Sequence, residues 1–233
     1  NTAVAESLSQ FYDELKDTPA DQMSEAVHEL VKRAIVKHKK VIFNGNGYTD
    51  EWVAEAEKRG LYNLKSTPEA LTRFIDEKNI ALFTKHKIFT KGEIYSRYEI
   101  LLENYVKTLH IESKTMQDMV RRDFLPALMK YTDQVTCSIS GKKAVADLPC
   151  TAETKLLQKL AGYYESIYDA EEKLEADTKT AEGMEDTLEA ANFYHEVILA
   201  DMAAIRSAAD AAEEYIPDEI LPYPNYEELL FSV

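Results

Sequence analysis

The chain has 233 residues, of which 45% are hydrophobic and 30% charged, and its formal net charge is −15. The apolar fraction is enough for a sizeable core in one elongated or two small domains, which argues against global disorder. The acidic balance argues against a protein that wraps nucleic acid, since neutralising phosphates requires clustered Lys and Arg.

The sequence also predicts a cytoplasmic location. No segment approaches the roughly 20 consecutive apolar residues that span a bilayer, and residues 1–17 lack the cationic start and apolar run of a signal peptide. Only Cys137 and Cys150 are present, so we expect reduced thiols and not a disulfide framework.

Helices are predicted from the start of the chain, because Gly and Pro number only seven each. Residues 3–16 place apolar side chains at steps of three and four, an amphipathic stripe that must rest on another surface. The stripe consists of Val4, Leu8, Phe11, Tyr12 and Leu15. A second helix is expected over residues 19–39. The cations from Lys32 to Lys40 suit the negative end of its dipole better than a phosphate patch.

Short helices and turns are expected as far as Phe89. The only run that could be a strand is Val41–Phe43, and residues 44–47 (Asn-Gly-Asn-Gly) suit a turn. A helix capped by Thr49 or Asp50 then ends at Gly60.

The next start signal is the run Ser-Thr-Pro-Glu at residues 66–69, which predicts a helix over residues 70–77. From Thr90 onward the apolar spacing favours a long helix over residues 92–131, about 60 Å in length at 1.5 Å per residue. Pro126 predicts a kink near Phe124, because proline lacks an N–H and clashes with the preceding turn.

A heptad seam follows, which predicts a coiled-coil-like packing. It runs through Leu160, Tyr163, Ile167, Ala170, Leu174, Asp177, Ala181, Met184, Leu188, Ala191, His195, Ile198, Met202, Ile205, Ala209 and Ala212. Poor helix formers between Asp177 and Gly183 predict an antiparallel hairpin that folds back there and packs on the 92–131 helix. After Pro217 the tail contains enough apolar side chains that we expect it to dock on another surface.

These elements predict an all-α fold in which a cluster of short helices precedes a long antiparallel helical bundle or hairpin. The expected regions are residues 1–89 for the short helices, 90–216 for the bundle and 217–233 for a docking tail.

Chemical motifs were weighed against simpler structural explanations. Gly45 and Gly47 begin a dinucleotide fingerprint, but its third glycine would fall at Asp50, so we interpret them as a turn. Glu25 and His28 form a single Glu-x-x-His motif, whereas bundle metal sites need two copies. His195, in the seam, is interpreted as a packed or hydrogen-bonded core residue.

The remaining polar groups give no case for an active site. The acidic pairs 171–172 and 213–214 are interpreted as solvating surface, and no nucleophile motif is present. We therefore assign no catalytic, cofactor-binding or metal-binding residue to the chain.

Two neighbouring segments are distinctive: residues 41–52 are Val-Ile-Phe-Asn-Gly-Asn-Gly-Tyr-Thr-Asp-Glu-Trp, and residues 55–61 are Glu-Ala-Glu-Lys-Arg-Gly-Leu. Together they resemble the C-terminal part of a type III glutamine synthetase. Three further segments resemble this family in the same order along the chain. They are residues 1–6, residues 121–127 with their Arg-Arg and Leu-Pro-Ala motifs, and residues 223–231. The resemblance covers nearly the whole chain.

The resemblance implies a ligase of glutamine biosynthesis, which condenses glutamate with ammonia using ATP and Mg²⁺ or Mn²⁺. In this family the catalytic groups lie largely on a barrel that precedes the present segment, so the chain alone is expected to be inactive. Its implied partners are the catalytic domain of the same polypeptide and other subunits of a homo-oligomeric ring. The stripe of residues 3–16 would cover the barrel.

Two other hypotheses remain open at this point. One is a free-standing helical module that binds a partner helix through the seam or the acidic hairpin. The other is a bundle metalloprotein.

Overall fold

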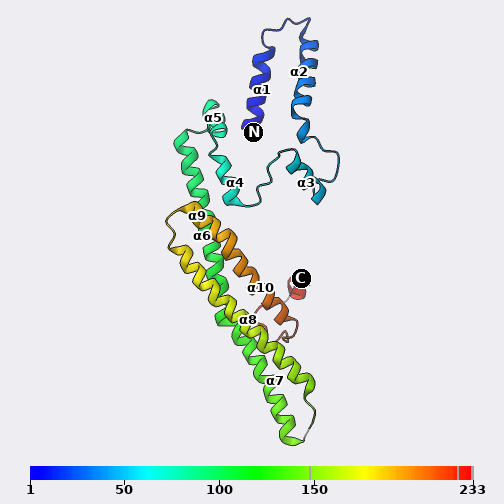
Figure 1. Cartoon of the computed structure of the whole chain (residues 1–233), viewed down its shortest axis with the longest axis vertical. Helices are drawn as coiled ribbons and strands as arrows, with labels where there is room; N and C mark the ends of the chain where they lie inside the picture. Colours follow the sequence, from blue (N-terminus) through cyan, green and yellow to red (C-terminus); the bar gives the residue numbers. More distant parts are fainter. Residues whose placement is uncertain (147, 225, 232–233) are drawn as a thin grey trace. The chain divides into compact units, whose positions relative to one another are not determined.

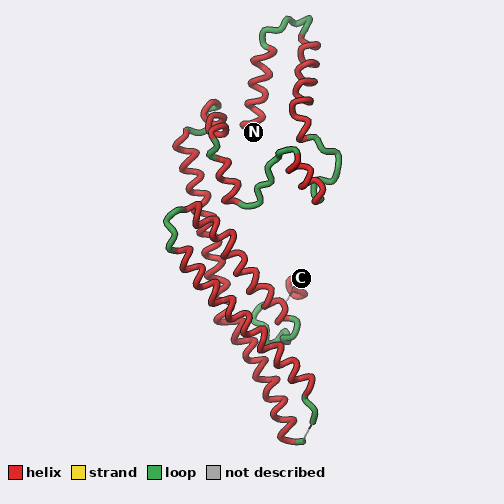
Figure 2. Tube along the Cα trace, in the orientation of Figure 1, coloured by secondary structure: helices red, strands yellow, loops and turns green. Residues whose placement is uncertain are grey.

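The computed structural model describes residues 1–146, 148–224 and 226–231. Over these residues the chain is helical and contains no strand, so the all-α prediction is confirmed (Figures 1 and 2). The chain divides into two compact units, residues 1–101 and 102–233. The predicted region boundaries at 89/90 and 216/217 stay predictions.

The first unit consists of short helices. They are α1 (Thr2–Leu15), α2 (Met23–His38), the 3-10 turn η1 (Lys39–Val41), α3 (Asp50–Lys58), α4 (Thr67–Phe74), α5 (Glu77–Lys85) and the beginning of α6 (Lys91–Met119). Helix α2 begins at Met23 and not at Pro19, because a turn closed by the Gln22 amide on the Pro19 carbonyl comes first. The possible strand at Val41–Phe43 is the end of η1 followed by extended backbone.

Local sequence signals set the ends of these helices. Thr49 is the N-cap of α3, and Gly60 follows its end with a φ of +67°, as predicted. Ser66 caps α4 by accepting a hydrogen bond from the Glu69 amide. The predicted helix over residues 70–77 is wrong at its end, since α4 stops at Phe74 and the Asn79 side chain donates to the terminal Arg73 carbonyl.

The second unit is built on the continuation of α6. A π-helical turn, η2 (Val120–Phe124), joins α6 to α7 (Leu125–Val145), so the helix extends beyond the predicted end at Tyr131. In η2 the Leu125 amide donates to the Val120 carbonyl, five residues earlier. This wider turn lies immediately before Pro126, and it accommodates the proline without ending the helix.

The predicted hairpin is confirmed. Its arms are α8 (Thr151–Glu182) and the run α9 (Thr187–Phe193), π-turn η3 (Tyr194–Ile198) and α10 (Leu199–Glu213). The chain reverses after Gly183, six residues beyond Asp177. Thr178 and Thr180 lie within the helix, where their hydroxyls donate to carbonyls four residues earlier.

The hairpin packs on the α6–α7 rod, as predicted (Figure 1). Every residue of the predicted seam is buried or half-buried. The core joins both arms to the rod and contains Leu109, Val120, Phe124, Leu125, Leu128, Val135, Leu160, Ile167, Leu174, Ala181, Tyr194, Ile198, Ile205, Ala212, Ile216 and Ile220.

The tail docks in part. Ile220 is buried, and the Tyr223 hydroxyl donates to the Asp123 carboxylate at 2.5 Å. The short helix α11 (Tyr226–Phe231) instead leaves Leu229, Leu230 and Phe231 exposed. Asn225 and residues 232–233 of the predicted tail lie outside the described residues.

Candidate functional site

The most unusual surface of the first unit is the apolar stripe of α1. No residue of α1 is buried, and the exposed fractions of Val4, Leu8 and Tyr12 are 61%, 61% and 68%. Phe11 and Leu15, the other members of the predicted stripe, are half-buried. The helix therefore presents to solvent the face that its sequence predicts to be covered.

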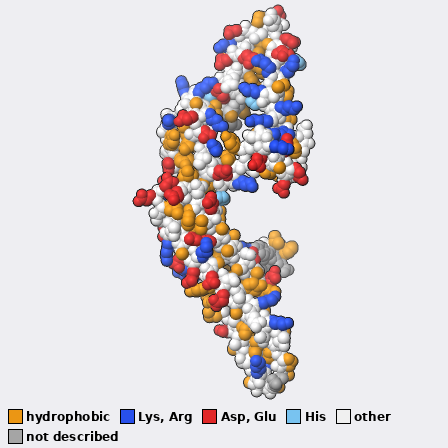
Figure 3. All heavy atoms as spheres, viewed as in Figure 1, with side chains coloured by type: hydrophobic (Ala, Val, Ile, Leu, Met, Phe, Trp, Pro, Cys, Tyr) orange, Lys and Arg blue, Asp and Glu red, His pale blue; other side chains and the backbone are white. Residues whose placement is uncertain are grey.

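Helix α2 extends this exposed apolar surface. Leu30 is its buried residue, whereas Val27, Val31 and Ile35, four residues apart, are exposed. Figure 3 shows Lys and Arg side chains gathered along the same helix. Lys37 and His38 occupy its last turn and are exposed, which confirms a solvated helix end.

A polar cluster joins α1 to α5 inside the first unit. The Glu6 carboxylate accepts from the Lys85 ammonium and contacts the His86 ring nitrogen, both at 2.6 Å. The Gln10 amide also donates to it. The hydrogen bonds from Lys85, Gln10 and His86 lower the pKa of Glu6 to about 2.

The second unit contains a buried polar layer that the sequence did not reveal. The side chains of Ser113 and Thr178 are fully buried and their hydroxyls lie 2.7 Å apart. The Gln117 amide donates to both hydroxyls. A polar residue on a helical seam gives no signal of its partner on another helix, so sequence reasoning missed this layer.

Two carboxylates are also buried in the second unit, one of them against expectation. Glu171, predicted to solvate the surface, is buried and pairs with Arg121 at 2.7 Å. The pair is possible because Arg121 lies on η2, opposite α8. Asp201, on α10, pairs with Lys173, and burial raises the pKa of its carboxyl. Lys173 also binds Asp177, whose pKa it lowers.

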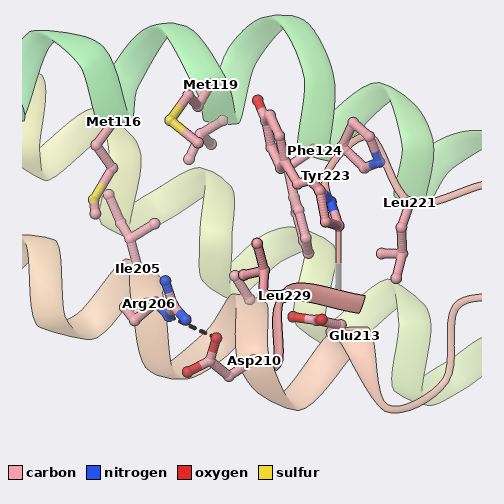
Figure 4. Close-up of a pocket in the computed structure, with 14 residues that line it drawn as sticks. Met116, Met119, Phe124, Ile205, Arg206, Asp210, Glu213, Leu221, Tyr223 and Leu229 are labelled. Atoms are coloured by element: carbon pink, nitrogen blue, oxygen red, sulfur yellow. Dashed lines mark ion pairs between the residues drawn. The ribbon is translucent and has the colours of Figure 1, made fainter. Parts of the chain in front are cut away.

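A pocket of about 320 Å³ lies between η2, α10 and the tail (Figure 4). Met116, Met119 and Phe124 form one wall, Ile205 and Ala209 the opposite wall, and Tyr223 one side. The Arg206–Asp210 ion pair lies at its polar edge. Its lining is mostly apolar, so it offers no convergent set of catalytic groups.

The histidines considered as metal ligands, His28 and His195, lie on α2 and η3. Glu25 and His28 are exposed on α2, and the His195 ring lies 3.3 Å from the Tyr105 hydroxyl, which confirms its hydrogen-bonded core role. Among the described residues, no group of three or more His, Cys, Asp or Glu side chains is placed to hold a metal ion. These residues do not fit a metal or ATP site, and we derive no chemical step through either group on this chain.

The remaining predicted features are structural. Residues 44–47 form the predicted turn before the Thr49 cap. Cys137 is exposed, Cys150 is buried, and both thiols are free. No helix in the described part of the chain is long and apolar enough to cross a membrane.

The described residues form an all-helical protein with exposed amphipathic faces and a packed hairpin. A family model, the glutamine synthetase C-terminal domain, matches residues 26–143. The chain belongs to this family, and the predicted resemblance to the C-terminal region of type III glutamine synthetases is confirmed.

Relatives of this chain are named as glutamine synthetases. A glutamine synthetase of Butyrivibrio fibrisolvens is 50% identical over 214 residues, which are 91% of this chain and 31% of that protein. The type-3 glutamine synthetase of Dictyostelium discoideum is 33% identical over 99% of this chain and 32% of its own length. A glutamine synthetase of Bacteroides fragilis is 28% identical over the whole chain and 33% of its own length. The chain thus spans about a third of the length of these relatives.

Proposed function

We propose that this chain is a non-catalytic, structural part of a type III glutamine synthetase, and that it serves packing and subunit assembly. The parent enzyme would ligate ammonia to glutamate with ATP and Mg²⁺ or Mn²⁺, in the cytoplasm. Its catalytic groups would lie in the part of the polypeptide outside these residues. The partners of this region would be that part and other subunits of a homo-oligomeric ring.

The observation that carries the proposal is the exposed stripe of α1. Burying a side chain such as Leu or Val stabilises a protein by about 1.5 to 3 kcal/mol. A helix that exposes several such side chains therefore gains free energy when another surface covers them. Val4, Leu8 and Tyr12 face away from their own unit. Because the relatives are about three times as long as the matched segment, the polypeptide offers a large surface that could cover this stripe.

A paired substitution tests the proposal. In a full-length type III glutamine synthetase that carries this region, Val4→Ser with Leu8→Ser should lower the midpoint of thermal inactivation or the fraction of assembled subunits. In the isolated chain the same pair should change the free energy of unfolding by less than about 0.5 kcal/mol, as for other exposed sites. Equal stability and assembly of the full-length variant and its parent would contradict the role of the stripe.

An activity assay tests the non-catalytic part of the proposal. With ATP, Mg²⁺, glutamate and ammonia, the isolated chain should release no phosphate above blank, whereas the full-length enzyme should. Turnover by the purified chain would contradict the proposal. Activity in neither protein would favour the alternative of a helical interaction module.

A further inference from the structure

Residues 41–48, called here the 41–48 loop, combine four large apolar or aromatic side chains with no charged residue and lie at the surface. All eight of its residues are exposed, among them Val41, Ile42, Phe43 and Tyr48. The side chain of Tyr48 is 100% exposed. The loop has no charged residue in a chain where 30% are charged, and depletion of charge is typical of the core of a protein interface.

Arg59 holds the base of the loop. Its guanidinium donates to the carbonyl of Ile42 at 2.9 Å and to that of Lys40 at 3.2 Å. Glu55 fixes the same guanidinium through a 2.7 Å ion pair, and the guanidinium carbon lies 5.5 Å from the centre of the Trp52 ring. Helix α3 therefore anchors the backbone of the loop through one side chain.

Aromatic stacking fixes the middle of the loop. The Phe43 ring stacks on the Trp52 ring with their centroids 4.2 Å apart. Gly45 passes so close to Phe43 that an added Cβ would lie 2.5 Å from the ring. A side chain at position 45 would therefore push the Phe43 ring away from its place on Trp52.

The end of the loop is fixed by side-chain hydrogen bonds. The Asn46 carboxamide oxygen accepts from the Tyr48 amide at 3.1 Å, and the Thr49 hydroxyl donates to the Asn46 carbonyl at 3.2 Å. These bonds set the backbone on both sides of Tyr48 without using its side chain. The loop thus presents a fully exposed tyrosine on a backbone that is already ordered.

We propose that the 41–48 loop inserts into a concave apolar site on the part of a type III glutamine synthetase polypeptide outside this chain, with Tyr48 as its anchor. The inference rests on the proposed function and deepens it. Tyrosine is favoured at such contacts because it buries a large apolar ring and keeps a polar tip. The site should offer apolar walls, a hydrogen-bond partner for the phenol and no charge.

Pre-organisation distinguishes this loop from an ordinary surface turn. Binding through a flexible segment costs ordering free energy at the moment of contact, whereas this loop is ordered beforehand by Arg59, Trp52 and Asn46. The partner is the rest of the polypeptide because the relatives are about three times longer than the matched segment, which leaves most of their surface outside it.

Nitration of tyrosines by tetranitromethane, read by mass spectrometry, tests the contact directly. Tyr48 should react readily in the isolated chain and at least about tenfold more slowly in the full-length enzyme. Tyr62, which is two-thirds exposed and outside the loop, is the matched control and should react similarly in both. Equal nitration of Tyr48 in both proteins would overturn the proposal.

A second measurement separates contact from folding. Tyr48→Ser should leave the unfolding midpoint of the isolated chain unchanged, since the side chain is fully exposed, and should speed amide exchange over residues 41–61 of the full-length enzyme. Tyr62→Ser, which removes a ring that contacts Arg73 and Lys78 within the chain, should leave amide exchange over residues 41–61 of the full-length enzyme unchanged. The readouts do not depend on ligase activity, so a Tyr48 that is nitrated in an active full-length enzyme as readily as in the isolated chain would sink this inference and leave the proposed function standing. An inactive full-length protein would instead count against the proposed function.

Discussion

The Ser113 hydroxyl lies 2.7 Å from the Thr178 hydroxyl, at the centre of the second unit, with both side chains fully removed from solvent. The Thr178 hydroxyl donates to the Leu174 carbonyl, so the Ser113 hydroxyl is the donor of the pair. The contact joins α6 to α8 at one register. If α8 shifted along α6, the buried Ser113 hydroxyl would lose its acceptor and the Gln117 amide would lose one of its two acceptors, so this layer fixes the register between the hairpin and the α6–α7 rod.

Replacing Thr178 by Val keeps the shape and removes the hydroxyl. The Ser113 hydroxyl then loses its acceptor, and the Gln117 amide loses one of its two acceptors. We therefore expect the free energy of unfolding to fall by about 1 to 3 kcal/mol. Urea unfolding followed by circular dichroism measures the change. The triple variant Ser113→Ala, Gln117→Leu, Thr178→Val, which removes all three polar groups of the layer, should recover part of the loss, and a single variant as stable as its parent would show that the layer contributes nothing.

The buried carboxylate of Asp201 predicts a pH dependence with a definite sign. Burial raises the pKa of Asp201 in the folded state, so the protein loses stability as pH rises from the ordinary value of 3.8 through the folded pKa. Asp201→Asn should remove this loss, and its stability relative to the parent should grow with pH over that window.

Asp177→Asn provides the matched control on the same ammonium group. Lys173 lowers the pKa of Asp177, so its contribution is present above pH 3.8 and fades as the pH falls through the folded pKa. The two variants should therefore have opposite slopes of stability against pH. Slopes of the same sign would contradict the assignment of the two carboxylates.

The Glu6 cluster predicts how acid releases α1. Because the pKa of Glu6 is lowered to about 2, the stability that it contributes is present above pH 4.5 and is lost as the pH falls toward 2. The protection factors of the α1 amides, which are corrected for the intrinsic exchange rate at each pH, should fall over this range. Glu6→Gln should lower these protection factors already at pH 6, and protection factors in that variant that equal those of the parent at every pH would rule out the cluster as the tether.

The heptad seam can be tested at its centre. Leu174 is fully buried between α8 and its neighbours, so Leu174→Ala should cost about 2 to 5 kcal/mol of unfolding free energy. Val145→Ala, at an exposed helix end, should change it by less than about 0.5 kcal/mol. Equal effects at the two sites would mean that the seam is not the core of the second unit.

The long-range packing of this unit follows from periodicity, because residues such as Ile167 and Ile198 can be buried on one side only if the two arms face each other. Boundaries were less predictable. The helix continues past Pro126 because η2 widens by one residue, and α4 ends at Phe74 because Asn79 satisfies the carbonyl of Arg73. The first depends on a local backbone hydrogen bond that spans five residues, and the second on a hydrogen bond between two elements, neither of which a residue pattern encodes.

The candidate surfaces were predictable to different degrees. The stripe of α1 is visible in the spacing of Val4 and Leu8, whereas the burial of Glu171 depends on Arg121, which is 50 residues away along the chain. The role of Arg59 in ordering the 41–48 loop has no sequence signal either, because it acts on the carbonyls of Lys40 and Ile42.

Hydrogen exchange of α1 tests the central claim most directly, because this helix has no buried residue and an exposed apolar stripe. Amide exchange of residues 2–15 would be followed by mass spectrometry in the isolated chain and in the full-length enzyme at the same pH and temperature. We predict that the amides of α1 exchange at least about tenfold more slowly in the full-length enzyme, where the stripe is covered, than in the isolated chain. Exchange at the same rate in both proteins would contradict the claim that this region packs against the rest of a glutamine synthetase through α1.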